Sequence, residues 1–205
     1  RSAPRRRRVR AASGRGLDLF LSRLIAGGRI RRDRGRLIGP FMTYKRTYNY
    51  ELARSIMTHS RVYPHISDDY SPNSQNYRPF EDESLWYVLV TSDDGELLGL
   101  FLFVPMNAIC WDVHTCLLPK CWGPSARRAG RGMAEWVWGN TLCHRIITSV
   151  PETNRLALQF AIACGMTEYG RNEKSILKGG RLLDQICLGI SRPLTATTIE
   201  EPQEV

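Results

Sequence analysis

Apolar positions recur along the chain with two different periods, and these periods predict where the helices and strands lie. A spacing of three to four residues, typical of a helix, predicts helices over 50–58, about 124–140 and about 152–164. Alternating or continuous runs of apolar and β-branched residues predict strands over 84–91, 97–105, 108–118 and 144–150. Two more strands, over 172–178 and 181–190, flank the Gly179-Gly180 turn. Residues 64–79 are rich in turn formers, so a loop is expected there.

The order of these elements predicts an α/β protein, in the α+β sense of a mixed sheet flanked by helices. The Asp-Gly turn in "SDDGE" joins the first two strands as an antiparallel hairpin. Strand, helix, strand and helix then follow one another between 108 and 164. The strands at 108–118 and 144–150 should therefore run parallel through a right-handed crossover. Antiparallel strands on both sides of this pair exclude a doubly wound nucleotide-binding fold.

The positive charge of the chain is concentrated in its first 41 residues. This leader holds 13 Arg, no Lys and two Asp, a net charge of +11. The rest of the chain holds 16 Lys and Arg against 18 Asp and Glu. Three interpretations of the leader stay open: a wrongly extended start or disordered arm, a basic arm that binds nucleic-acid phosphates, or an Arg-rich transit peptide. A domain over 42–192 and a loose acidic tail over 193–205 are expected to follow.

Six cysteines lie in or beside apolar segments, and no secretory signal precedes them. This usage predicts reduced thiols in a cytoplasmic protein. No pair has C-x-x-C spacing, so no metal site is predicted. The longest apolar stretch, 97–104, is far shorter than the ~20 residues of a membrane-spanning helix, so no membrane partner is expected.

The most specific pattern begins where the β-branched strand at 146–150 stops at Pro151 and a helix follows almost at once. In the GNAT superfamily of N-acetyltransferases, a motif at this place runs from an Asn through an Ala and an apolar residue to a Gly-Phe pair. The chain fills these positions with Asn154, Ala157, Phe160, Gly165 and Met166. The segment 178–192 also resembles the closing hairpin of that family. From Tyr44 to Arg192 the chain therefore resembles GNAT acetyltransferases, and small phage-encoded GNAT-like proteins in particular.

The resemblance implies acetyl-CoA as co-substrate. The family's phosphate-binding loop aligns with 122–127, which fits it loosely, whereas a literal match at 127–132 would shorten the following helix to about two turns. We prefer the first alignment, which leaves Gly130 and Gly132 inside the helix. A helix N-terminus offers N–H donors to a pyrophosphate, and such contacts are expected from Gly123, Ser125, Ala126, Arg127 and Arg128. The pantetheine arm is expected along the strand edge at Cys116, Leu117 and Leu118, between the two parallel strands.

Acetyl transfer to an amine needs the neutral amine, and therefore a general base. Asp112 and His114 are two residues apart on the strand where the family often places its base, so they should share one face. His114 is the expected base, and Asp112 is either a second base or the group that orients it. Many family members protonate the leaving thiolate with a Tyr on the last helix. Phe160, at the corresponding place, cannot do so, which leaves water or another Tyr such as Tyr87 or Tyr169.

Asn154 has two interpretations. It either caps the last helix or, if Thr153 supplies that cap, bonds the pantetheine amide or a water. The function expected from these residues is acetyl transfer from acetyl-CoA to a primary amine of an unidentified protein or small molecule. The alternatives are a catalytically inactive GNAT-like binding module, contacting nucleic acid through its leader, and an unrelated α/β protein. The oligomeric state stays open.

Overall fold

The computed structural model describes residues 42–193, so the basic leader and the acidic tail lie outside the described residues. Within them the chain forms seven strands: β1 (Met42–Thr47), β2 (Trp86–Ser92), β3 (Leu97–Pro105), β4 (Cys110–Leu117), β5 (Arg145–Pro151), β6 (Thr167–Lys178) and β7 (Arg181–Ser191). The helices are α2 (Tyr50–Met57), α3 (Tyr63–Ile66), α4 (Pro124–Asn140) and α5 (Arg155–Ala163), with a 3-10 turn, η1, at Pro119–Cys121. Among the described residues no helix combines the length and apolarity that crossing a bilayer requires.

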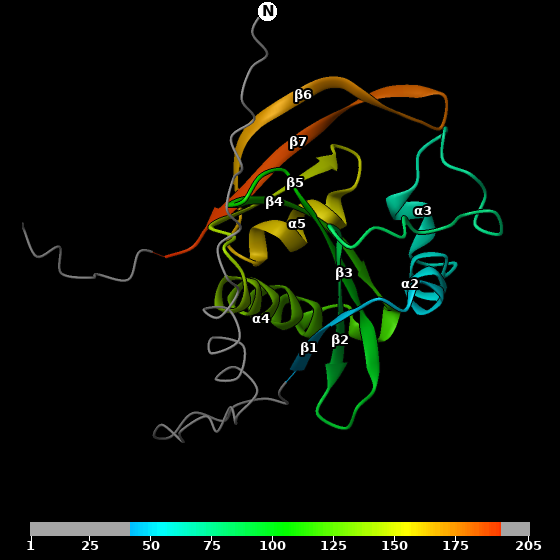
Figure 1. Ribbon diagram of the computed structural model, residues 1–205. Coiled ribbons are helices and arrows are strands. Elements are labelled where there is room, and N and C mark those ends of the chain that lie inside the picture. The colour runs from blue at the N-terminus through cyan, green and yellow to red at the C-terminus, as the bar shows by residue number, and fades with distance from the viewer. Residues whose placement is uncertain (1–41, 194–205) are drawn as a thin grey trace, which may run out of the picture. The chain divides into compact units, whose positions relative to one another are not determined.

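All seven strands belong to one sheet in the order β1-β2-β3-β4-β5-β7-β6 (Figure 1). Five neighbouring pairs are antiparallel, and the central pair, β4 and β5, is parallel. This arrangement confirms the predicted mixed sheet and the predicted parallel pair. The parallel pair is where the two antiparallel parts of the sheet meet.

Helices cover both faces of the sheet because the central strands are apolar on both sides. In β2 and β3, alternate residues enter different cores. Val88, Val90, Phe101 and Phe103 pack with α4 and α5, whereas Tyr87, Leu100 and Leu102 pack with α2. The two layers are visible in Figure 1, where α4 and α5 lie together and α2 and α3 form a separate pair.

Helix α4 contains Gly130 and Gly132 in its interior, as the preferred alignment predicted. Both glycines stand where another element comes close. A Cβ at Gly130 would lie 2.4 Å from the Cys164 Sγ, and one at Gly132 would lie 2.5 Å from the Tyr44 hydroxyl. That hydroxyl donates a hydrogen bond of 3.0 Å to the Ala129 carbonyl. Each glycine costs the helix about 1 kcal/mol relative to Ala, and in return α5 and β1 approach the helix closely.

Most predicted ends of elements lie within two residues of the observed ones, and the short helix α3 lies at the start of the expected loop. Three further differences are larger. Strand β1 was not predicted; it is an edge strand with alternating exposure and carries Lys45 and Arg46, which weaken the apolar signal. Strand β6 starts at Thr167, five residues earlier than expected, because its exposed first half gains its order from pairing with β7. Helix α5 starts at Arg155 and not at 152, because Asn154 caps it.

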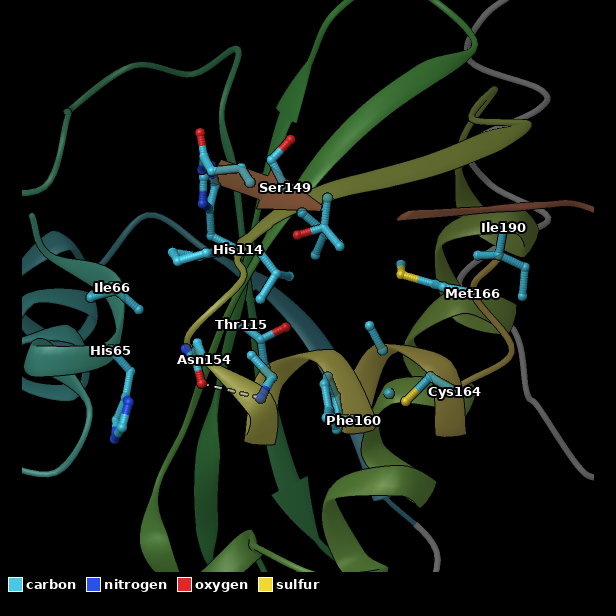
Figure 2. Close-up of a pocket in the computed structure, with 18 of the residues that line it drawn as sticks. His65, Ile66, His114, Thr115, Ser149, Asn154, Phe160, Cys164, Met166 and Ile190 are labelled. Atoms are coloured by element: carbon cyan, nitrogen blue, oxygen red, sulfur yellow. Dashed lines mark hydrogen bonds between the residues drawn. The ribbon is translucent and has the colours of Figure 1, made fainter. Parts of the chain in front are cut away.

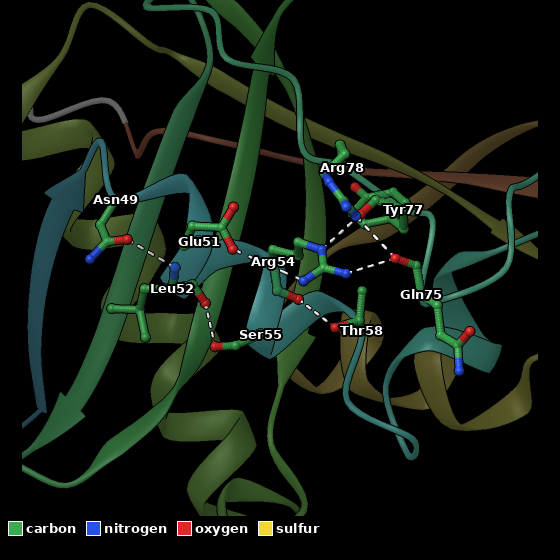
Figure 3. A network of polar contacts seen from close by, with 9 residues as sticks. All are labelled: Asn49, Glu51, Leu52, Arg54, Ser55, Thr58, Gln75, Tyr77 and Arg78. Atoms are coloured by element: carbon green, nitrogen blue, oxygen red, sulfur yellow. Dashed lines mark hydrogen bonds and ion pairs between the residues drawn. The ribbon is translucent and has the colours of Figure 1, made fainter.

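The long connection between α2 and β2 is fixed to α2 by a polar network (Figure 3). Asn49 caps α2 by accepting from the Leu52 N–H at 2.9 Å. On the next turn, the guanidinium of Arg54 donates to the carbonyls of Gln75 and Tyr77, at 2.8 and 2.9 Å. A segment without regular structure after α3 is therefore tied to a helix that is itself packed on the sheet.

Two glycines provide a test of this packing. Gly99 has φ +143°, and a Cβ there would lie 2.5 Å from the Cys116 carbonyl oxygen, whereas Gly139 faces open space in α4. Gly99→Ala should lower the free energy of unfolding by at least about 2 kcal/mol, because backbone strain and a backbone contact add. Gly139→Ala should raise it by about 0.5–1 kcal/mol through helix propensity. Urea unfolding measures both, and equal losses in the two variants would contradict the described strand geometry.

Candidate active site

The candidate site lies where β4 and β5 part. The two strands pair at only three positions, Cys110, Asp112 and the residue between them, opposite Arg145–Ile147. Beyond these positions β4 stays paired with β3 and β5 stays paired with β7. On the side that faces β5, the end of β4 therefore has no strand partner within the described chain.

A cavity of about 230 Å³ occupies this gap. It is lined from both faces of the sheet. Gly130, Met133, Phe160 and Cys164 line it from α4 and α5, and His65, Ile66, His114 and Gln185 line it from the opposite face. Figure 2 shows His65 and Ile66 at the α3 side of the cavity, and Phe160 and Cys164 along α5. A molecule bound here would touch helices on one side of the sheet and the α3 segment on the other.

His114 and Asp112 project from β4 on the same face. The His114 Nε2 lies 3.9 Å from the Asp112 Oδ2, which is an ion-pair distance and too long for a hydrogen bond. The imidazole side chain is 52% exposed and the carboxylate 26%, so the carboxylate stands behind the imidazole. Burial raises the pKa of the Asp112 carboxyl, while His114 and the Val113 N–H oppose the rise. The Asp112 Oδ1 is buried and has no hydrogen-bond partner among the described residues.

Asn154 supplies the cap of α5. Its Oδ1 accepts from the Ala157 N–H at 3.2 Å, so Thr153 does not provide the cap. The bond is drawn in Figure 2, where Asn154 stands at the rim of the cavity. The Nδ2 donor takes no part in the cap. The capping interpretation of Asn154 is thus confirmed, and its contact with a ligand stays a prediction.

The first turn of α4 presents the predicted phosphate-binding residues. Gly123 is the N-cap with φ +76°, and Pro124 follows at the first helical position. The N–H groups of Ser125 and Ala126 lie in the first turn of the helix, where no intrahelical acceptor exists. Ala126 is buried, so only its backbone can contact a ligand.

The two neighbouring arginines point in different directions. Arg127 lies beside Cys164, whose Sγ is 3.9 Å from the Arg127 carbonyl. Burial raises the pKa of the Cys164 thiol, and the positive charges of Arg131 and Arg127 oppose that rise. Arg128 bonds the Ser125 hydroxyl at 3.2 Å and lines a separate hollow with Glu96 and Lys120. Of the two guanidiniums, that of Arg127 is therefore the one closer to α5. None of the five predicted phosphate-binding residues of this turn lines the cavity itself.

The residues predicted for the pantetheine arm fill the core with their side chains. Cys116 is fully buried on the α2 side of the sheet and Leu117 is buried on the α4 side. Leu118 follows the strand, and its N–H donates a hydrogen bond of 2.9 Å to the Leu98 carbonyl. Any contact of Cys116 or Leu117 with a ligand is thus through the backbone. Burial raises the pKa of the Cys116 thiol to about 12 and that of Cys164 to about 11, so neither is a reactive thiolate.

Neither Tyr considered as a proton donor reaches the cavity. Tyr87 is buried, and its hydroxyl donates to the Phe80 carbonyl at 3.0 Å. Tyr169 stacks under the Arg145 guanidinium at 5.0 Å. Phe160 does line the cavity, from α5. Among the lining residues that were not predicted, His65 and Gln185 reach the cavity from distant segments that carry no local motif, and Ser149 reaches it from β5.

No protein-family model and no curated protein matches the chain. Solved structures do. A chimera of the spermidine N-acetyltransferase SpeG of Vibrio cholerae with hSSAT superposes with a TM-score of 0.61 at 15% identity, over 73% of this chain and 95% of that chain. SpeG of the same organism in complex with CoA and spermine gives a TM-score of 0.55 at 18% identity, over the same shares. The described part of the chain therefore has the GNAT fold of these acetyltransferases.

The raised pKa of Asp112 predicts a stability effect with a definite sign. The native state disfavours the ionised carboxylate, so this group contributes stability at low pH that is lost as pH rises through its folded pKa. Asp112→Asn should therefore raise the free energy of unfolding by about 1 kcal/mol near pH 8, because the substitution removes a buried charged atom that has no hydrogen-bond partner. The gain should shrink as pH falls toward the ordinary range of a carboxyl.

Asp94 provides the control with the opposite sign. The Ser92 hydroxyl donates to this exposed carboxylate and lowers its pKa. Asp94→Asn should therefore lower the melting temperature near pH 8 and lose that effect in acid. Melting curves of both variants at several pH values make the comparison. A loss of stability in Asp112→Asn near pH 8 would show that the carboxylate has a partner.

Proposed function

We propose that the protein transfers an acetyl group from acetyl-CoA to a primary amine. The observation that carries the proposal is the cavity at the parting of β4 and β5, which has an imidazole with a carboxylate beside it on one face of the sheet and the packed sides of α4 and α5 on the other. The GNAT fold supports it, since the neighbours with that fold are N-acetyltransferases, one of them bound to CoA and spermine.

Acetyl-CoA would enter from the side of α4 and α5. Its pyrophosphate would accept from the first-turn N–H groups of α4, near Gly123, Ser125 and Ala126, with Arg127 adding a positive charge. Its pantetheine arm would follow the free backbone edge of β4 toward the gap, much as an added strand would. The Asn154 Nδ2 and the ring of Phe160 lie along that route.

The amine would enter from the opposite face. A lysine-like amine is neutral in only about one molecule in 10³ at pH 7, a deficit of about 4–5 kcal/mol. We assign the removal of the ammonium proton to His114, which accepts it directly or through a water molecule. Two imidazoles line the cavity, and His114 is the one with a carboxylate behind it to stabilise the imidazolium that forms. The neutral nitrogen then attacks the thioester carbon, the carbon–sulfur bond breaks, and CoA leaves as a thiolate. The extra proton that the attacking nitrogen still carries is lost to water, which leaves the neutral amide.

The departing thiolate needs a proton, and Phe160 cannot supply it. Because Tyr87 and Tyr169 lie away from the cavity, we assign this proton to water. The same observation favours the second candidate, an inactive GNAT-like binding module. Acetyl-CoA binding without turnover on any amine would select it. A role of the leader in nucleic-acid binding, the cytoplasmic location and the phage origin stay predictions.

The first prediction of this proposal compares the two neighbouring arginines. Arg127→Ala in the full chain should weaken acetyl-CoA binding about tenfold, because a charge-assisted contact is lost. Arg128→Ala should change the dissociation constant by less than about twofold, since its guanidinium is engaged with Ser125 in the separate hollow. Isothermal titration measures both. Equal effects of the two substitutions would show that the cofactor does not run along the α5 side of α4.

The second prediction concerns the base. His114→Ala should lower kcat at pH 7 by about 10²-fold, with little change in the KM for acetyl-CoA. The deficit should shrink as pH approaches 10, because the amine then loses its proton unaided. His65→Ala is the control and should cost much less, since no carboxylate stands behind that imidazole within the described chain. A deficit that is the same at every pH would assign His114 a role other than proton removal.

A further inference from the structure

The wall of the cavity carries no negative charge. Its ionisable side chains within the described residues are His65, His114 and Cys164, and none of its lining residues is Asp or Glu. An imidazole is either neutral or positive, and burial raises the pKa of the Cys164 thiol to about 11, which keeps it neutral. Asp112, the nearest carboxylate to His114, stands behind the imidazole and is not among the lining residues.

Three of the carboxylates in the neighbouring segments have other partners. Asp69 accepts from the N–H groups of Gly179 and Gly180, at 2.8 and 2.7 Å. Asp184 and Glu152 both pair with Arg171, at 2.7 and 3.2 Å. None of these groups is left to face a positively charged ligand in the cavity.

The acceptor side of the cavity is also confined. The tip of the β6–β7 hairpin is fastened to the α3 segment: the Lys178 ammonium donates to the carbonyls of Pro64 and Ser67, at 2.6 and 2.8 Å, and the Asp69 N–H donates to the Leu177 carbonyl at 3.0 Å. Figure 1 shows the tip of this hairpin meeting the segment that follows α3. Together with the Asp69 contacts, these bonds join segments 110 residues apart. They limit the room beyond the reacting amine.

The remaining groups on this side are apolar or neutral hydrogen-bonding groups. Ile66 and Ile176 supply apolar surface, and Ser149 and Gln185 supply neutral polar atoms. Such a wall solvates an apolar or weakly polar body well. A second ammonium group would lose its hydration here without gaining a carboxylate, which is unfavourable.

We propose that the acceptor is a small primary amine whose body carries no second positive charge, and therefore not a polyamine. The inference rests on the proposed function for the identity of the reacting group. It sets this chain apart from the solved neighbours, which are spermidine N-acetyltransferases, one of them bound to spermine. The fold is shared, but the charge of the cavity wall is suited to a different acceptor.

The test compares two amines of equal length. n-Pentylamine and cadaverine (1,5-diaminopentane) differ only in a terminal ammonium, and each is titrated into the full chain saturated with CoA. n-Pentylamine should bind about tenfold more tightly, because cadaverine must bury an unpaired charge. Cadaverine binding as tightly or more tightly would overturn the inference, and so would spermidine binding more tightly than n-pentylamine. Absence of binding by both amines at millimolar concentration would overturn it as well.

A charge substitution gives the converse test. Gln185→Glu keeps the shape of the side chain and places a carboxylate in the cavity wall, so cadaverine should bind about tenfold more tightly and n-pentylamine should not. Gln159→Glu makes the same change on the exposed side of α5, outside the cavity, and should leave both affinities unchanged. An equal gain in both variants, or no gain for Gln185→Glu, would contradict the inference.

Binding and turnover separate the two proposals. The heat of amine binding to the CoA complex tests the acceptor class without any reaction. Thiol release from acetyl-CoA in the presence of n-pentylamine tests the acetyl transfer. Tight binding of n-pentylamine without thiol release would refute the proposed function and leave the acceptor class supported. Thiol release with spermidine as the better substrate would support the proposed function and refute the acceptor class.

Discussion

The candidate site of this domain depends on one interruption, between β4 and β5, in a sheet whose other neighbouring strands pair along most of their length. β4 and β5 pair at three positions, whereas β4 keeps seven paired positions with β3 and β5 keeps seven with β7. Each strand is thus held more strongly by its outer neighbour than by the other, so the gap between them stays open. Main-chain groups along a free strand edge need partners. A ligand with amide groups, such as a pantetheine arm, can supply them.

The packing of α4 against α5 sets what borders this gap. The absence of a side chain at Gly130 lets Phe160 and Cys164 approach α4, so an aromatic ring and a neutral thiol line the cavity. Arg131 fixes the relative position of the two helices by donating twice to the Ala163 carbonyl, at 3.1 and 2.8 Å. The guanidinium thus satisfies the C-terminal end of α5. The approach that Gly130 permits is thus secured by charge-assisted hydrogen bonds from the next residue of α4.

The elements that the sequence predicted are those with strong local periodicity: α4, the β2–β3 hairpin, and the segment from β5 through α5. Edge strand β1 escaped prediction because none of its six residues is buried and two are basic. The site was predicted where chemistry and spacing coincide on one strand, as at Asp112 and His114. It was not predicted where distant segments meet. His65 and Gln185 reach the cavity through a fold that only the sheet order defines, and no local pattern marks them.

This division explains how chains of 15–18% identity can share a fold. The alternation of apolar residues in β2 and β3 and the glycines of α4 define the scaffold, and many sequences satisfy those requirements. The acceptor side is built from α3, the segment after it and the β6–β7 hairpin, which are joined by backbone carbonyls, one carboxylate and one ammonium. Contacts of that kind constrain the path of the chain but few of its side chains. The charge of the cavity wall can therefore change while the gap between β4 and β5, where we place the proposed transfer, is kept.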